Sequence, residues 1–188
     1  MTSILFPGQG SQTPGMVKDF YDNFKIAKLT FEEIEDYTKI DLKKIIFDNS
    51  DPRLNLTQFT QISIFTASYT IFKVYCSETN VKSENINIMM GHSLGEYTAL
   101  ACSNRISLKE CSLILKKRGE LMNNAVPPNE TGMAALIGKG SDLIQNIIDK
   151  NNLNLEIAND NSNIQIVISG NIDEIKKSEK IFLNNGIK

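Results

Sequence analysis

The sequence predicts an α/β fold in which a parallel sheet presents a serine on a sharp turn, followed by a smaller α+β unit. Three observations favour this fold. The apolar run at 88–90 leads directly into GHSLG at 91–95, and a second apolar run at 4–6 leads into a glycine-rich loop. After residue 130 the pattern changes to short strands that alternate with amphipathic helices.

Composition favours a soluble enzyme. The chain has 188 residues, of which 41% are hydrophobic, enough to bury a core in one domain or in one domain with an insertion. The formal net charge is -2 and the charged residues are interspersed, which argues against a nucleic-acid partner. No apolar run is long enough to cross a bilayer, and the N-terminus lacks the pattern of a signal peptide.

The three cysteines, Cys76, Cys102 and Cys111, fall in helix-like segments and have neither metal-ligand nor disulfide spacing. They predict reduced thiols within the core. We therefore expect a cytoplasmic protein with no membrane anchor and no metal site.

The first predicted element is a short strand at 4–6, which ends in the loop PGQGSQ at 7–12. A glycine-rich loop at a strand end can present backbone N–H groups to an anion. Acyl-transfer enzymes need two such donors for a tetrahedral intermediate, one of them from a separate loop. Gln9 fits that second place, although an ordinary turn explains the loop equally well.

The longest predicted helix runs from about 58 to 77. Two neighbouring apolar stripes indicate that it is buried in the core. These stripes comprise Ile64, Ala67, Ile71 and Val74, and Phe65, Tyr69, Phe72 and Cys76. Gln61 lies early on this helix, where it is either a polar cap or a residue that reaches a pocket.

The strand at 88–90 and the following GHSLG predict a strand-to-helix turn with Ser93 at its apex, a candidate nucleophile. Side chains at Gly91 and Gly95 would crowd such a turn. The helix that begins near Leu94 directs unpaired N–H groups toward a developing oxyanion, so the Leu94 amide is the other candidate donor. A purely structural turn is the alternative.

The single histidine of the chain, His92, directly precedes Ser93. Adjacent side chains on a tight turn diverge, so His92 is badly placed to remove a proton from its neighbour. We expect it to support the site rather than to act as the base.

Residues 107–123 predict a helix that begins with a capping box formed by Ser107 and Glu110. Arg118 falls on its apolar stripe, which follows helical spacing. The other members of that stripe are Leu108, Cys111, Leu115 and Met122. A cation on an apolar face needs a partner, unless it only reaches out from the edge of the stripe to water.

Two prolines at 127 and 128 indicate a boundary between a first domain, 1–126, and a second, 127–188. The second reads as strand, helix, strand, strand, helix, one strand short of a ferredoxin-like unit. The predicted ranges are 133–137, 141–150, 153–158, 165–169 and 173–183. The missing strand would begin at or after Ile187, so we expect a C-terminally truncated chain.

Together, FPGQGSQ at 6–12 and GHSLGEY at 91–97 resemble the signature pair of the malonyl-CoA:acyl carrier protein transacylases of bacterial fatty-acid synthesis. The resemblance keeps its order and spacing along the whole chain. It extends through KKRG at 116–119, GMAALIG at 132–138, IANDNS at 157–162 and QIVISG at 165–170. The chain is thereby identified as the N-terminal portion of a member of this family.

The resemblance implies an α/β-hydrolase-like acyltransferase core with an inserted ferredoxin-like α+β subdomain. It implies transfer of a malonyl group from malonyl-CoA to Ser93 and then to the phosphopantetheine thiol of acyl carrier protein. The backbone amides of Gln9 and Leu94 would form the oxyanion hole, and Arg118 would bind the malonyl carboxylate through its planar fork. No cofactor is implied, and nothing in the sequence points away from a monomer.

Further residues gain expected roles from the resemblance. Gln61 and His92 are expected at the substrate pocket, and Asn159 and Asn161 are expected to bring amide groups to it across a groove between the two domains. For the two asparagines, side chains that only tie down their loop are the alternative. Lys116 and Lys117 are candidates for a basic surface toward acidic acyl carrier protein, or for a merely solvated helix face.

The main departure from the family is its base histidine, which lies beyond the matched region. General-base assistance contributes about 10²–10⁴-fold in rate, so we expect the chain as given to turn over slowly or not at all. Two alternatives stay open, a serine hydrolase such as a thioesterase and a non-catalytic remnant that binds carrier protein.

Overall fold

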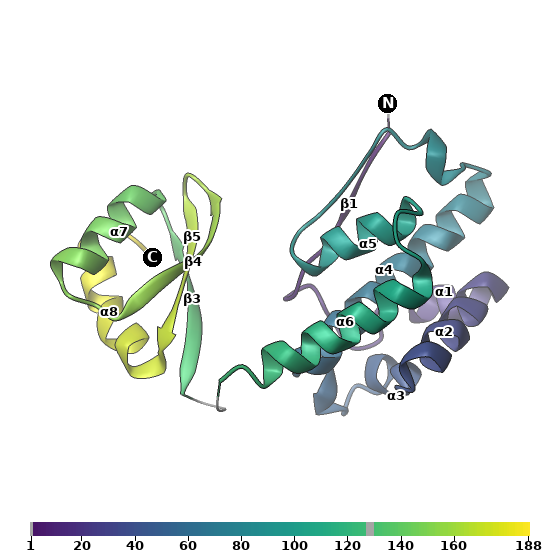
Figure 1. Ribbon diagram of the computed structural model, residues 1–188, viewed down its shortest axis with the longest axis horizontal. Helices are drawn as coiled ribbons and strands as arrows, with labels where there is room; N and C mark the ends of the chain where they lie inside the picture. The colour runs from purple at the N-terminus through teal and green to yellow at the C-terminus, as the bar shows by residue number, and fades with distance from the viewer. Residues whose placement is uncertain (1, 127–129) are drawn as a thin grey trace. The chain divides into compact units, whose positions relative to one another are not determined.

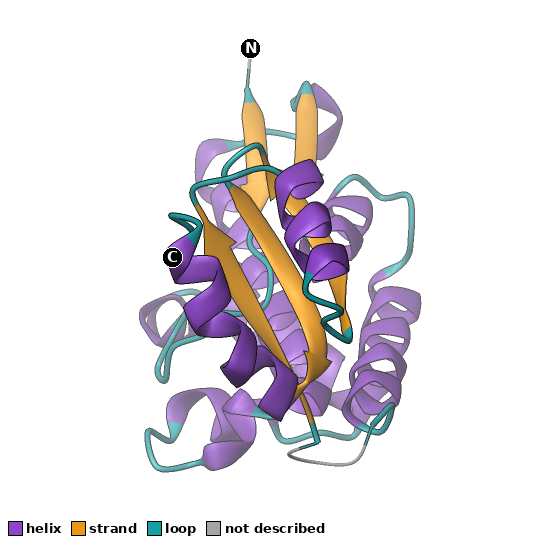
Figure 2. Cartoon of the chain, turned by 90° about the vertical axis from the view of Figure 1, so that its left-hand side faces the viewer, coloured by secondary structure: helices purple, strands orange, loops and turns teal. Residues whose placement is uncertain are grey.

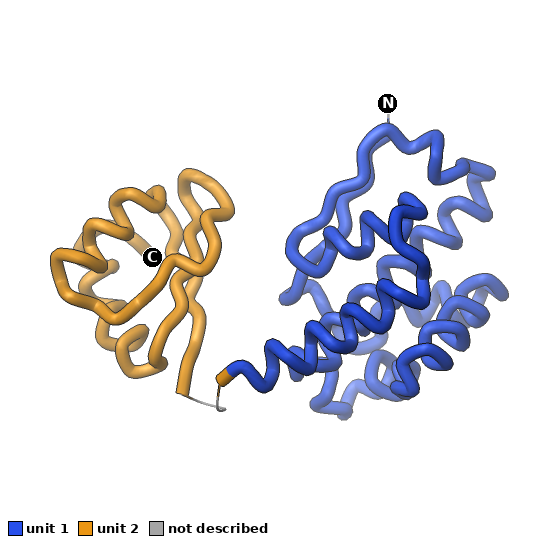
Figure 3. The backbone as a smooth tube through the Cα atoms, in the orientation of Figure 1, with its two compact units in different colours: residues 1–125 blue, residues 126–188 orange. Residues whose placement is uncertain are grey.

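The computed structural model describes residues 2–126 and 130–188. The chain divides into two compact units, residues 1–125 and 126–188 (Figure 3). Each unit has its own cluster of buried hydrophobic side chains. The proline pair at 127 and 128, which suggested the domain boundary, lies outside the described residues.

The first unit is mainly helical, with two short strands (Figure 1). Its elements are β1 (Ser3–Phe6), α1 (Lys18–Asn23), α2 (Lys25–Thr38), α3 (Leu42–Phe47), the 3₁₀ helix η1 (Pro52–Asn55), α4 (Thr57–Thr79), the 3₁₀ helix η2 (Ser83–Asn85), β2 (Ile88–Gly91), α5 (Leu94–Cys102) and α6 (Leu108–Asn123). β1 and β2 pair in parallel, with Phe6 opposite Gly91. The predicted parallel pairing is confirmed, and both glycine motifs leave the sheet at the same end.

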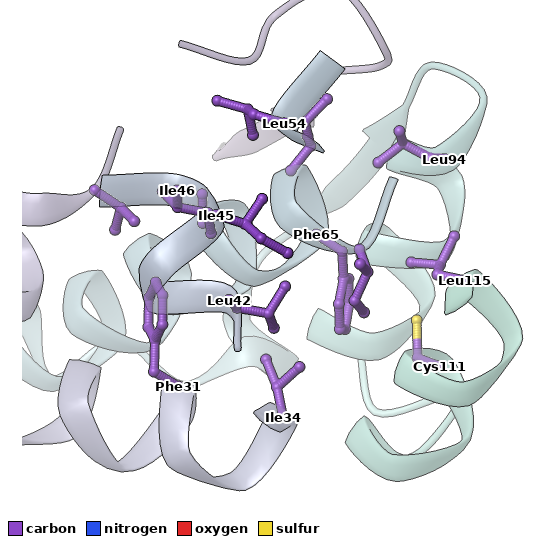
Figure 4. Close-up of a cluster of buried hydrophobic side chains, with 14 of the residues drawn as sticks. Phe31, Ile34, Leu42, Ile45, Ile46, Leu54, Phe65, Leu94, Cys111 and Leu115 are labelled. Carbon is purple, nitrogen blue, oxygen red and sulfur yellow. The ribbon is translucent and has the colours of Figure 1, made fainter. Parts of the chain in front are cut away.

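The core of the first unit lies around α4, which is buried from Thr60 through Ala67. Figure 4 shows side chains of α2, α3, α5 and α6 gathered around Phe65. The prediction of a buried helix is confirmed for most of α4, but it is wrong at Ile71, which is 40% exposed. Among the described residues, no helix is both long and apolar enough to cross a membrane.

The parallel strands are covered on one face. Phe6 packs edge-on against Phe72 of α4, with 6.1 Å between ring centroids, and Met89 joins the same cluster. The alternate side chains face outward, and Leu5 and Met90 are 71% and 49% exposed. A groove of about 470 Å³ runs between β1 and α4, and it explains the exposure of Ile71. No candidate site residue lines this groove.

The second unit is an antiparallel sheet with two helices (Figure 2). Its elements are β3 (Thr131–Ile137), α7 (Ser141–Lys150), β4 (Leu155–Ser162), β5 (Gln165–Asn171) and α8 (Ile172–Asn184). The strand order is β3-β5-β4, and both helices lie on one face of the sheet (Figure 1). The predicted order of elements is confirmed. Ile137 also exchanges two backbone hydrogen bonds with Lys188, at 2.6 and 3.0 Å.

The predicted strand at 153–158 is displaced in the structure, where β4 begins at Leu155 and continues to Ser162. The register with β5 shifts between Ile157 and Asn159 and again between Asp160 and Ser162. Such bulges let polar residues continue a strand that a strict apolar alternation would have ended. The segment that we expected to be a loop is therefore part of the sheet.

Candidate active site

Ser93 occupies a strained turn between β2 and α5. Its backbone has φ 56° and ψ -112°, a conformation that non-glycine residues rarely adopt. The strain is maintained by close packing, because a Cβ on Gly91 would lie 1.9 Å from the carbonyl carbon of Gly95. A Cβ on Gly95 would lie 2.4 Å from the Phe6 oxygen. The result is an exposed Ser93 side chain at the apex of the turn.

The first turn of α5 begins directly behind this serine. Leu94 is the first residue of the helix and is fully buried. The next two backbone N–H groups already have acceptors: Gly95 donates to the backbone oxygen of His92 at 2.9 Å, and Glu96 donates to that of Ser93 at 3.1 Å. The amide of Leu94 is thus among the N-terminal N–H groups that lack an intrahelical acceptor. The macrodipole of the helix favours negative charge at this end.

The glycine-rich loop after β1 packs against the serine turn. The His92 N–H donates to the Phe6 oxygen at 3.2 Å, and a Cβ on Gly8 would lie 2.7 Å from both the Nδ1 and the carbonyl oxygen of His92. The loop is held in place by Ser11 Oγ, which donates to the Gly8 oxygen at 2.8 Å. Gln9 Nε2 donates to Thr57 Oγ1 at the start of α4, at 3.2 Å. The structure thereby brings the two sequence motifs together.

Arg118 reaches the serine from α6. Its Nη2 donates to Ser93 Oγ at 3.1 Å, and its Nη1 donates to Gln61 Oε1 at 2.5 Å. The guanidinium also lies 5.8 Å from the centre of the Tyr97 ring, a distance at which the ring face attracts a cation. The half-buried Arg118 therefore points at Ser93, and it does not simply extend from the edge of its stripe.

Gln61 lies behind Arg118 and has no exposed surface. Its oxygen accepts from Arg118, and its Nε2 donates to the sulfur of Met122 at 2.9 Å. This contact is possible because α4 and α6 approach closely at Gly119, where an added Cβ would lie 2.9 Å from the Gln58 oxygen. Gln61 is therefore fully buried and is linked to Ser93 through Arg118.

Two residues beside the site, Tyr97 and Met122, received no site role in the sequence analysis, which placed Met122 only on the apolar stripe of its helix. Tyr97 lies four residues after Ser93 on α5, and Met122 lies four residues after Arg118 on α6. Residues at that spacing share a helix face, so each stands beside a candidate that was already identified. The spacing was the signal available for finding them.

Asn159 and Asn161 lie on β4 in the second unit, on a strand where we expected a loop. Asn161 Nδ2 donates to Gln165 Oε1 at 3.3 Å, across the hairpin between β4 and β5.

The two lysines that precede Arg118 on α6 differ in their contacts. Lys116 Nζ donates to the backbone oxygen of Thr38 at 2.9 Å, while Lys117 is exposed and its Nζ lies 3.7 Å from a Glu120 carboxylate oxygen. One of the two candidate basic side chains thus ties α6 to α2.

The cysteines are packed in the first unit, where Cys111 Sγ donates to the backbone oxygen of Tyr97 at 3.4 Å. Cys102 and Cys111 are buried and Cys76 is half-buried. Burial raises the pKa of the Cys111 thiol to about 12 and raises the pKa values of the Cys76 and Cys102 thiols as well. These thiols stay protonated at neutral pH, and among the described residues no group of three or more His, Cys, Asp or Glu side chains is placed to hold a metal.

The sequence has relatives among malonyl CoA-acyl carrier protein transacylases. It is 35% identical over 190 residues to one from Bacillus subtilis (strain 168), which covers 99% of this chain and 58% of the relative. It is 34% identical over 183 residues to a polyketide biosynthesis malonyl CoA-acyl carrier protein transacylase of the same organism, covering 97% of this chain and 60% of that protein. The chain thus spans less than two thirds of the length of these relatives.

Solved structures agree with the sequence comparison. A malonyl CoA-acyl carrier protein transacylase from Clostridium perfringens matches with a TM-score of 0.87 and 34% identity, covering 100% of this chain and 58% of that one. An acyl-carrier-protein-S-malonyltransferase from Bartonella henselae matches with a TM-score of 0.90 and 34% identity, covering 100% and 61%. The acyl transferase domain family matches residues 4–181. This match over most of the chain shows that the chain belongs to the acyl transferase domain family.

Proposed function

We propose that this chain carries the nucleophile and the carboxylate-binding arginine of a malonyl-CoA:acyl carrier protein transacylase, with Ser93 carrying the acyl group between the two thiols. The observation that best supports this proposal is the contact of Arg118 Nη2 with Ser93 Oγ, 3.1 Å apart. A cation so close to a nucleophile favours an acyl group that itself carries a negative charge.

The first half-reaction is an acyl transfer to oxygen. Ser93 Oγ attacks the thioester carbon of malonyl-CoA while its proton passes to a base, and the tetrahedral intermediate places negative charge on the former carbonyl oxygen. The amides of Leu94 and Gln9 are the donors that we propose for this oxyanion. Collapse of the intermediate breaks the carbon–sulfur bond, and coenzyme A leaves as the thiol after taking up the proton.

We call the proposed binding of the malonyl carboxylate by Arg118 the clamp. The clamp explains why the site would select malonyl over acetyl groups. A malonyl carboxylate replaces Ser93 Oγ as an acceptor for the Arg118 guanidinium, whose planar fork suits a pair of charge-assisted hydrogen bonds. This exchange frees the serine for attack. An acetyl group has no carboxylate and leaves the half-buried guanidinium without a charged partner, so we expect discrimination against it.

The second half-reaction runs in reverse, with the phosphopantetheine thiol of acyl carrier protein attacking the malonyl-serine ester. One solved relative is a malonyl-transacylase in complex with its type II polyketide acyl-carrier protein, which supports a carrier protein as the acceptor. We propose that the reaction needs no cofactor, since Ser93, Arg118 and backbone amides supply all the groups named here except the base. His92 adjoins Ser93 on the turn, and we propose for it a supporting role.

Intact mass spectrometry after incubation with malonyl-CoA tests the proposal. We expect a malonyl adduct on the wild-type chain and none on Ser93→Ala. Tryptic mapping should place the adduct on the peptide that contains Ser93. Slow adduct formation agrees with the proposal, since base assistance is worth about 10²–10⁴-fold.

The same experiment separates the other candidates. A thioesterase would release free coenzyme A and malonate continuously, with little accumulated adduct. A remnant that only binds carrier protein would form no adduct and release no coenzyme A. Either result rejects the transferase proposal.

A further inference from the structure

The contact between Gln61 and Met122 indicates how the Arg118 guanidinium is held toward Ser93. The Gln61 side chain is fully buried and uses both ends of its amide, with the oxygen toward Arg118 and the nitrogen toward the Met122 sulfur. An amide that is rotated by half a turn would point two donor hydrogens at a guanidinium, which can only donate. A thioether sulfur is an acceptor and cannot donate, so it agrees with the observed orientation at the other end.

We propose that Met122 is a positioning residue for acyl selection, because its sulfur holds the Gln61 amide in the orientation that fixes the Arg118 guanidinium at Ser93. This inference rests on the proposed function. It concerns how the proposed clamp is held, and it assigns a role to a residue whose sequence pattern indicates only apolar packing.

The Met122 sulfur can control the orientation of the Gln61 amide because Gln61 is buried. Because Gln61 has no exposed surface, water cannot replace a missing acceptor for its Nε2. An unsatisfied buried donor is costly, so the amide would turn toward another acceptor when the sulfur is removed. That rotation would take Oε1 away from Arg118 Nη1. The contacts of the guanidinium with Ser93 Oγ and with the Tyr97 ring would then remain.

Met122→Leu tests the proposal, since leucine has nearly the same volume and no acceptor. We expect the rate of Ser93 acylation by malonyl-CoA, divided by the rate with acetyl-CoA, to fall by about threefold to tenfold, as for loss of one ordinary hydrogen bond. Met90→Leu is the matched control, because Met90 is exposed to a similar extent, 49% against 46% for Met122. It should leave the ratio unchanged. An unchanged ratio in Met122→Leu would overturn the proposal.

A double-mutant cycle separates positioning from packing. Gln61→Leu removes the amide through which Met122 is proposed to act, so Met122→Leu should have no additional effect on the ratio in that background. A packing role for Met122 would instead give additive changes. Additive changes would therefore reject the proposal even if the single variant loses selectivity.

A second readout does not depend on acylation. In ¹⁵N-labelled protein, the side-chain NH₂ signals of Gln61, assigned by their loss in Gln61→Leu, should exchange slowly with solvent deuterium and should exchange faster in Met122→Leu. Equal exchange in both proteins would refute positioning by Met122. If exchange is slow in the wild type and faster in Met122→Leu but no acylation occurs, the proposed function has failed while the positioning of Gln61 by Met122 stands.

Discussion

Arg118 of α6 donates from Nη2 to Ser93 Oγ across 3.1 Å, although Ser93 lies 25 positions earlier, on the turn before α5. A guanidinium hydrogen-bonded to the serine oxygen occupies a lone pair that the oxygen needs as a nucleophile. An incoming carboxylate competes for the same donor. On the proposed function, we expect the free site to favour a charged acyl group twice, first by attraction and then by release of the nucleophile.

Replacement of the arginine should change selectivity more than it changes reactivity. We expect Arg118→Ala to lower malonyl loading of Ser93 by about 10–100-fold, the value of a hydrogen bond to a charged group, with a much smaller effect on acetyl loading. Arg118→Lys is the control that retains the charge but loses the planar fork of the guanidinium. Its rate of malonyl loading should lie between those of the wild type and Arg118→Ala. Time courses of adduct mass with the two thioesters provide the measurement. A uniform loss with both would count against the clamp.

The serine turn should not tolerate a methyl group at Gly95. Its Cβ would lie 2.4 Å from the Phe6 oxygen and 2.8 Å from the Pro7 oxygen, both backbone atoms that cannot rotate away. We expect Gly95→Ala to lower the free energy of unfolding by about 1–3 kcal/mol and to abolish loading of Ser93.

Gly140→Ala is the matched control for that substitution, because its added Cβ would make only an ordinary contact, 3.5 Å from the Asn163 oxygen. Urea denaturation followed by circular dichroism compares the two variants. Equal stability of both would show that the loop after β1 yields to the methyl group.

The close approach of α4 and α6 at Gly119 should matter for selectivity. A Cβ there would lie 2.9 Å from the Gln58 oxygen and 3.0 Å from the Thr57 oxygen. Overpacking costs about 1–3 kcal/mol, and the better helix propensity of alanine offsets about 1 kcal/mol of it. We expect Gly119→Ala to be mildly destabilised and to lose malonyl preference, since the helices that carry Gln61 and Arg118 must separate. Gly119→Ser should be worse on both measures, whereas a more stable, fully selective Gly119→Ala would contradict the expectation.

The stability of the first unit should depend on Asp51 at low pH. The Arg53 guanidinium and backbone N–H hydrogen-bond to the Asp51 carboxylate and lower its pKa from 3.8 to about 2. Because the folded pKa lies below the unfolded value, this stabilisation is present above about pH 4 and is lost as the pH falls toward 2. Asp51→Asn should therefore flatten the pH dependence of stability between pH 4 and 2.

Arg53→Gln is the companion variant, since it removes the partner that lowers the pKa and should flatten the same part of the profile. Denaturation midpoints measured from pH 2 to 7 test both. An unaltered slope in Asp51→Asn would show that other carboxylates control acid stability.

Local features were predictable because neighbouring residues determine them. The capping box of Ser107 and Glu110 forms as expected, with Glu110 N–H donating to Ser107 Oγ at 3.2 Å and Ser107 N–H donating to Glu110 Oε2 at 3.1 Å. The strand-to-helix turn at Ser93 also forms as expected. Sequence analysis failed where packing overrides pattern, at Ile71 beside the groove and along β4, whose bulges carry polar residues such as Asn159 into a strand.

The sequence by itself determined the serine turn, the two motif-bearing strand ends and the face of α6 on which Arg118 lies, because steric and hydrogen-bonding rules act over a few residues. Only the tertiary structure decided what Arg118 meets. Its contact with Gln61 spans 57 positions, and the Gln61–Met122 contact spans 61. Such pairings depend on how closely α4 and α6 pack at Gly119, and helix spacing is a property of the assembled core that no local pattern contains.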